Sequence, residues 1–95
     1  MPVTRIIAEH GRTIASITGQ PVATDLASFV EQVQDAVQIM DLGLAGHFRD
    51  DAESLGSAAT YLVDAVGFDD DAPARAFLLG RASQHLADID AADYL

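Results

Sequence analysis

The sequence has no cysteine and no lysine, and its five arginines stand against fifteen acidic residues. Without cysteine, neither a disulfide nor a thiolate–zinc site can stabilise the fold. The formal charge of −10 argues against direct nucleic-acid binding, because that binding depends on lysine and arginine neutralising phosphates. Binding to an anionic membrane surface is unexpected for the same reason.

The acidity has more than one explanation. It would attract a basic protein partner by long-range electrostatics. It also suits solubility, a GC-rich genome or a cell with high internal salt. The sequence does not choose among these explanations.

Long hydrophobic runs are absent as well. No stretch approaches the roughly 18 apolar residues of a membrane-spanning helix, and the first residues lack the apolar run of a signal peptide, so we expect a cytoplasmic protein. The 95 residues are enough for one domain. Because a chain of this size buries only about 60–65% of its unfolded surface, we expect a homodimer or a permanent protein partner.

The clearest pattern predicts a helix over residues 24–43. Apolar residues recur there at intervals of four, three, four, three and four, which keeps one stripe of a helix against a partner helix. Between them lie polar residues, Gln32 and Asp35 among others, which form the opposite face. The apolar stripe consists of Leu26, Val30, Val33, Val37, Met40 and Leu44.

The same spacing recurs over residues 48–66 and predicts a second helix, packed antiparallel on the first. A single kinked helix through both segments is the alternative. A third helix is predicted over residues 72–90, because an acidic run followed by Pro73 is typical of a helix start. The apolar positions of these two helices are Phe48, Ala52, Leu55, Ala59, Leu62 and Val66, and then Leu78, Leu79, Ala82, Leu86 and Ile89.

Residues 1–19 are rich in β-branched side chains, which favour strands. His10 and Gly11 lie where a hairpin would turn, so a short β-hairpin, or a single strand at residues 13–18, is expected. The alternative is a helix, since several apolar residues would share one helical stripe. They are Val3, Ile6, Ile7, Ile14 and Ile17.

Together these patterns predict a mainly α fold within one small domain, residues 1–95. The expected architecture is a compact bundle of three main helices, made of an antiparallel helical hairpin and a C-terminal helix. A short β-hairpin or extended N-terminal segment would precede the bundle.

Two His-x-x-Asp pairs, His47–Asp50 and His85–Asp88, are the candidates for a metal site in the bundle. Residues three apart share a helix face, so each pair could present an imidazole and a carboxylate together. Aspartate is frequent enough here for such pairs to arise by chance, and the further inward carboxylates of a di-iron bundle are missing. The favoured interpretation is therefore that both histidines are structural or surface residues, with no metal or other cofactor.

Catalytic motifs are lacking too. The sequence has no Gly-x-Ser-x-Gly nucleophile elbow and no glycine-rich phosphate loop, and no serine has a local partner that would mark a nucleophile. We therefore expect a non-enzymatic protein.

The leading functional hypothesis is a helical protein that acts through protein–protein contacts or homo-oligomerisation. Phe77, Phe29 and Tyr61 are the candidate anchors, because aromatic side chains dominate interface energetics. Phe77 is favoured since it lies about 100° from the core stripe of its helix. The alternative is an acidic inhibitor, similar to an antitoxin, that mimics nucleic-acid charge against a basic partner.

Overall fold

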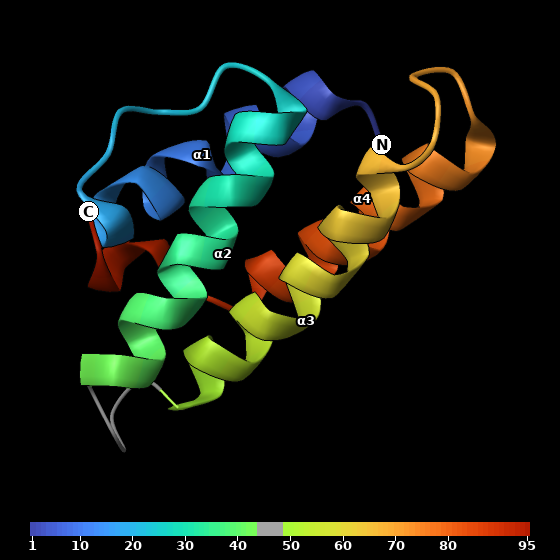
Figure 1. Ribbon diagram of the computed structural model, residues 1–95. Helices are drawn as coiled ribbons and strands as arrows, with labels where there is room; N and C mark the ends of the chain where they lie inside the picture. The colour runs from blue at the N-terminus through green and yellow to red at the C-terminus, as the bar shows by residue number, and fades with distance from the viewer. Residues whose placement is uncertain (44–48) are drawn as a thin grey trace.

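Helix is the main secondary structure of this chain, as its hydrophobic periodicity predicts. The computed structural model describes residues 1–43 and 49–95 (Figure 1). Across these ranges, no helix combines the length and the apolar character needed to cross a membrane. The elements in chain order are α1 (Val3–Thr18), α2 (Leu26–Gly43), α3 (Arg49–Val66), α4 (Pro73–Ala87) and the short 3-10 helix η1 (Ala91–Asp93).

The α-helices form a closed ring around one core. α3 packs against α2 and α4, and α1 packs against the same two helices. α1 and α4 run in the same direction: the Met1 amine donates to the Ala76 carbonyl near their starts, and Ser16 donates to the Tyr94 carbonyl near their ends. The described residues therefore contain one more core helix than the sequence predicts.

The prediction of a β-hairpin or strand in residues 1–19 is wrong, and no strand occurs in the described part of the chain. The segment forms α1, in which Ile6 and Ile14 are fully buried. β-Branched residues cost a helix only about 0.5 kcal/mol each relative to alanine, whereas burying an isoleucine side chain gains about 1.5–3 kcal/mol. Burial along the helical stripe therefore outweighs the local preference for strand, and the predicted three-helix bundle is a four-helix bundle.

Gly11, expected at a hairpin turn, lies inside α1 and lets the next segment pass close to the helix. A Cβ at this position would come within 3.2 Å of a Val22 methyl carbon. The turn comes instead at Gly19, whose φ of 70° is in the left-handed region. From there residues 20–25 run back along α1, so that α2 begins beside the first turn of α1 (Figure 1).

Two side chains fix the start of α2. The Ser28 amide donates to Asp25 at 2.8 Å, which caps the helix and lowers the pKa of this carboxyl. The Gln32 amide group donates to the Pro21 carbonyl. Gln32 is buried, so its assignment to the polar outer face of α2 is wrong. It turns toward the segment that connects α1 to α2, where its amide group pairs the Pro21 carbonyl.

The core follows the predicted apolar stripes with some rotation. Val66 is 44% exposed, because the buried side of α3 passes through Ala58 and Ala65 instead. Leu44 and Phe48 lie outside the described residues. The fully or largely buried apolar residues of the last three helices are Leu26, Phe29, Val30, Val33, Ala36 and Met40 of α2, Leu55, Ala58, Leu62 and Ala65 of α3, and Leu79, Ala82 and Leu86 of α4.

The chain after α4 closes one end of the bundle. Asp90 accepts a hydrogen bond from the Ala92 amide and so begins η1. The Tyr94 hydroxyl donates to Asp51 in α3, and burial together with this hydrogen bond raises the pKa of Tyr94. Because Ser16 in α1 donates to the Tyr94 carbonyl, the last residues are tied to both α1 and α3.

Candidate functional site

The outer side of α4 carries the most exposed aromatic side chain among the described residues. α4 packs against α3 and α1, which leaves its remaining side to solvent. Phe77 stands on that side and is 65% exposed. Pro73 starts the helix, and the buried residues of α4 set its rotation, so Phe77 has to point outward. Residues one turn apart share this surface, which we call the α4 face: Pro73, Ala76, Phe77, Gly80, Arg81 and Gln84.

The α4 face differs in charge from the rest of the molecule. α4 contains no acidic residue, and its two charged side chains are Arg75 and Arg81. The remaining 80 of the 95 residues, with three arginines and fifteen acids, therefore carry a formal charge of −12. Arg75 turns inward, where its Nε donates to the Ala65 carbonyl at 3.2 Å and its guanidinium pairs with Asp70. Arg81 stays exposed, so the α4 face is weakly basic on a strongly acidic protein.

Gly80 leaves open space beside Phe77. A Cβ built on Gly80 has no atom within 4 Å. Gly80 follows Phe77 by three residues and so lies one turn along the same face. A side chain from another molecule can therefore approach the α4 backbone at this point.

Tyr61 of α3 stands at one edge of the α4 face. Its ring stacks on that of His85, with centroids 5.6 Å apart and an angle of 15° between the planes. The Arg81 guanidinium carbon lies 5.7 Å from the Tyr61 ring centroid, within reach of a cation–π interaction. These three side chains hold one another in place and extend the α4 face toward α3.

Phe29, predicted as an exposed anchor, is fully buried and cannot contact a partner. It lies one turn after Leu26 and one turn before Val33, on the core side of α2. The predicted stripe misses Phe29 because a heptad stripe is narrow. The buried side of α2 is wider, since this helix packs against both α1 and α3.

The residues proposed for metal binding are not brought together in the described part of the chain. The His85 ring is stacked on Tyr61, and the Asp50 and Asp88 side chains are exposed. His47 lies outside the described residues. Within residues 1–43 and 49–95, no group of three or more His, Cys, Asp or Glu side chains is arranged to hold a metal ion.

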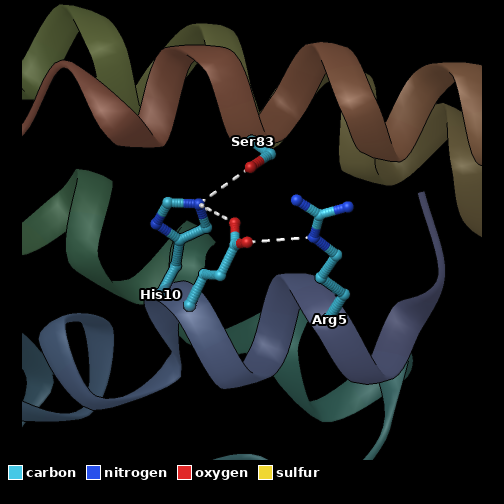
Figure 2. Close-up of polar contacts among 4 residues, drawn as sticks. Arg5, His10 and Ser83 are labelled. Carbon is cyan, nitrogen blue, oxygen red and sulfur yellow. Dashed lines mark hydrogen bonds and ion pairs between the residues drawn. The ribbon is translucent and has the colours of Figure 1, made fainter.

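A polar contact that the sequence did not single out joins α1 to α4 (Figure 2). Nε2 of His10 lies 2.8 Å from the hydroxyl oxygen of Ser83 and 3.7 Å from a carboxylate oxygen of Glu9. The other oxygen of Glu9 accepts a hydrogen bond from Arg5 at 3.0 Å. Burial lowers the pKa of His10, and the nearby Glu9 carboxylate opposes this shift in part.

This contact lacks the geometry of serine–histidine catalysis. In a catalytic triad the acid holds Nδ1 while Nε2 faces the serine, whereas Ser83 and Glu9 both lie at Nε2 of His10. The contact instead fixes α1 against α4. A signal for it exists in the sequence, because His10 lies four residues from Ile6 and four from Ile14, on the buried side of a helix.

Two features of the described residues thus have distinctive chemistry, namely the α4 face and the His10–Ser83 contact. The first is an exposed surface, and the second lies between two helices. No protein-family model, curated protein or solved structure matches this chain. A function can therefore be argued only from the geometry of these two features.

Proposed function

We propose that this chain is a non-enzymatic helical protein that acts by binding protein, and that its α4 face binds the same face of a second copy. The observation that carries the proposal is the position of Phe77. This aromatic side chain is 65% exposed on the acid-free face of a chain whose formal charge is −10. Aromatic side chains and arginine are among the residue types that contribute most to the binding energy of protein interfaces.

The charge distribution favours a second copy in antiparallel orientation. Two copies repel each other through most of their surfaces, and the repulsion is weakest where acids are absent. If Phe77 packs over Gly80 of the partner subunit, Arg81 points toward the acidic segment that precedes α4 there, Asp71 of the partner subunit included. Antiparallel α4 helices also place their macrodipoles in opposition, which is favourable.

The size of the α4 face sets the expected affinity. α4 has 15 residues and is therefore about 22 Å long. A single helix face of this length buries less than the roughly 1,200 Å² that marks a standard interface. We therefore expect a dissociation constant in the micromolar range.

Sedimentation velocity over a concentration series tests the proposal. The wild type should dimerise, and Phe77→Ser should raise the dissociation constant by at least about a hundredfold. Val63→Ser is the matched control, because Val63 is 48% exposed but lies one turn from Ala59, on the side of α3 that borders α2. A wild type that stays monomeric, or equal effects of the two substitutions, would contradict the proposal.

A further inference from the structure

A small cavity lies between α1, α4 and the chain that follows α4, next to the contact in Figure 2. Its volume is about 180 Å³. An engineered apolar cavity of about 150 Å³ holds benzene, so this one has room for a six-membered ring with a short substituent. Its apolar side includes Ile14, Leu86 and Ile89, and its polar side is formed by Glu9, His10 and Thr13.

The polar side of the cavity has hydrogen-bonding groups that the described residues leave unused. Thr13 is 8% exposed, yet its hydroxyl bonds to none of the described residues. His10 uses Nε2 toward Ser83 and Glu9, and no described residue bonds to its Nδ1. Figure 2 shows this second ring nitrogen directed away from Ser83 and Arg5. These two unused groups beside one cavity leave hydrogen bonds that a ligand could make.

All three polar side chains can accept a hydrogen bond from that ligand. The Glu9 carboxylate is an acceptor only, and the Thr13 hydroxyl accepts as well as donates. Nδ1 of His10 accepts whenever Nε2 carries the ring proton and donates it to Ser83. Three acceptors around one cavity favour a group with several hydrogens, and the net charge of −10 favours a cation.

We propose that this cavity binds a small organic ammonium ion with an apolar body of about six carbons. Its –NH₃⁺ group donates to Glu9, His10 and Thr13, and its body packs against Leu86 and Ile89. The Glu9 oxygen that is not bonded to Arg5 remains available for this contact. The site is separate from the α4 face, so it does not rest on the proposed dimer.

An NMR titration of the full, ¹⁵N-labelled chain near physiological salt tests the site with three probes of similar shape. Benzylamine is the ammonium, benzyl alcohol its neutral analogue and benzoate an anionic one. Benzylamine should shift the amide signals around the cavity, whereas benzyl alcohol should bind about tenfold more weakly, because it lacks the charge-assisted hydrogen bonds. Benzoate should not bind.

Substitutions in η1 separate the cavity from general attraction of cations to an acidic surface. Ala91→Phe adds bulk where Ala91 lines the cavity, and Ala92→Phe adds the same bulk at an exposed neighbour outside it. Benzylamine binding should vanish in Ala91→Phe, persist in Ala92→Phe and weaken about tenfold in Glu9→Gln. Equal binding of amine and alcohol, or binding that survives Ala91→Phe in a folded protein, would overturn the proposal.

Discussion

Replacing Gly80 by alanine should stabilise the monomer and weaken the proposed dimer. Gly80 lies inside α4, and a Cβ built on it has no atom within 4 Å. Alanine is favoured over glycine in a helix interior by about 1 kcal/mol, in large part because the unfolded chain then has less freedom to lose. For a domain of this size, such a gain raises the Tm by about 4–8 °C.

The dimer should respond in the opposite direction, because the new methyl group takes the space into which the partner's Phe77 would pack. A phenylalanine side chain has about 200 Å² of surface, and Phe77 is 65% exposed. About 130 Å² is therefore available for burial, which corresponds to about 3 kcal/mol. Loss of half this contact at each of two symmetric sites would cost about 3 kcal/mol, or about a hundredfold in the dissociation constant.

Gly56→Ala is the matched control for this prediction. A Cβ on Gly56 also meets nothing within 4 Å, but this glycine lies in α3 beside the groove that α3 forms with α2. Thermal unfolding at low concentration measures the monomer, and sedimentation at high concentration measures the dimer. Both substitutions should raise the Tm, whereas Gly80→Ala alone should raise the dissociation constant. Equal dissociation constants in the two variants would refute the packing of Phe77 over Gly80 of the partner subunit. A lower Tm for Gly80→Ala would refute the claim that the monomer has open space for a methyl group at Gly80.

Three further predictions concern contacts inside the monomer. Arg75→Gln should lower the free energy of unfolding, measured by urea titration, by about 1–3 kcal/mol, because the largely buried Arg75 guanidinium bonds to the end of α3. Arg49→Gln is the control: it breaks only an exposed pair with Glu53 and should cost less than about 1 kcal/mol. Stability should fall as the pH drops below 6.5, because burial lowers the pKa of His10 in the folded state, so that the unfolded chain binds more protons between that lowered pKa and 6.5. His10→Gln should remove this part of the pH dependence of the Tm, and an unchanged profile would contradict the assignment. Tyr94→Phe should speed hydrogen exchange of the Ile89 amide by about tenfold, because the residues after α4 lose their bond to Asp51. In the wild type this amide bonds to the Leu86 carbonyl at 3.1 Å. Equal exchange in the two proteins would show that the residues after α4 do not depend on the bond to Asp51.

Periodicity predicted the helical character of this fold, but it failed where two local signals disagreed. In residues 1–19 the β-branched side chains and Gly11 indicated a hairpin, while the apolar spacing indicated a helix. Burial of Ile6 and Ile14 against other helices decides the conflict. The sequence of residues 1–19 carries no information about those tertiary contacts. Gly11, which appears to mark a turn, instead lies where Val22 approaches α1 closely.

The candidate sites show a similar limit. The helical phase of Phe77 places it away from the core stripe, and its role as an anchor stays a prediction. Phe29 looked equally suitable, yet the width of a buried helix face depends on how many neighbours the helix has. The contact between His10 and Ser83 joins residues 73 positions apart. The helical spacing places His10 on the buried side of α1, but only the tertiary fold brings Ser83 opposite it and forms the cavity beside the contact.

Ionic strength distinguishes binding through the α4 face from the charge mimicry that the composition also allows. Two copies of charge −10 repel each other, and raising the salt from 0.01 M to 0.15 M shortens the range of that repulsion from about 30 Å to about 8 Å. The dimer should therefore strengthen with salt, since the exposed Arg81 contributes little attraction at the surface. A mimic would instead bind a basic partner through exposed acids such as Asp50, Glu53 and Asp64 on the outer side of α3, and its binding should weaken steeply with salt. A dimer that weakened with salt would show that attraction between charges, and not burial of Phe77, holds the two copies together.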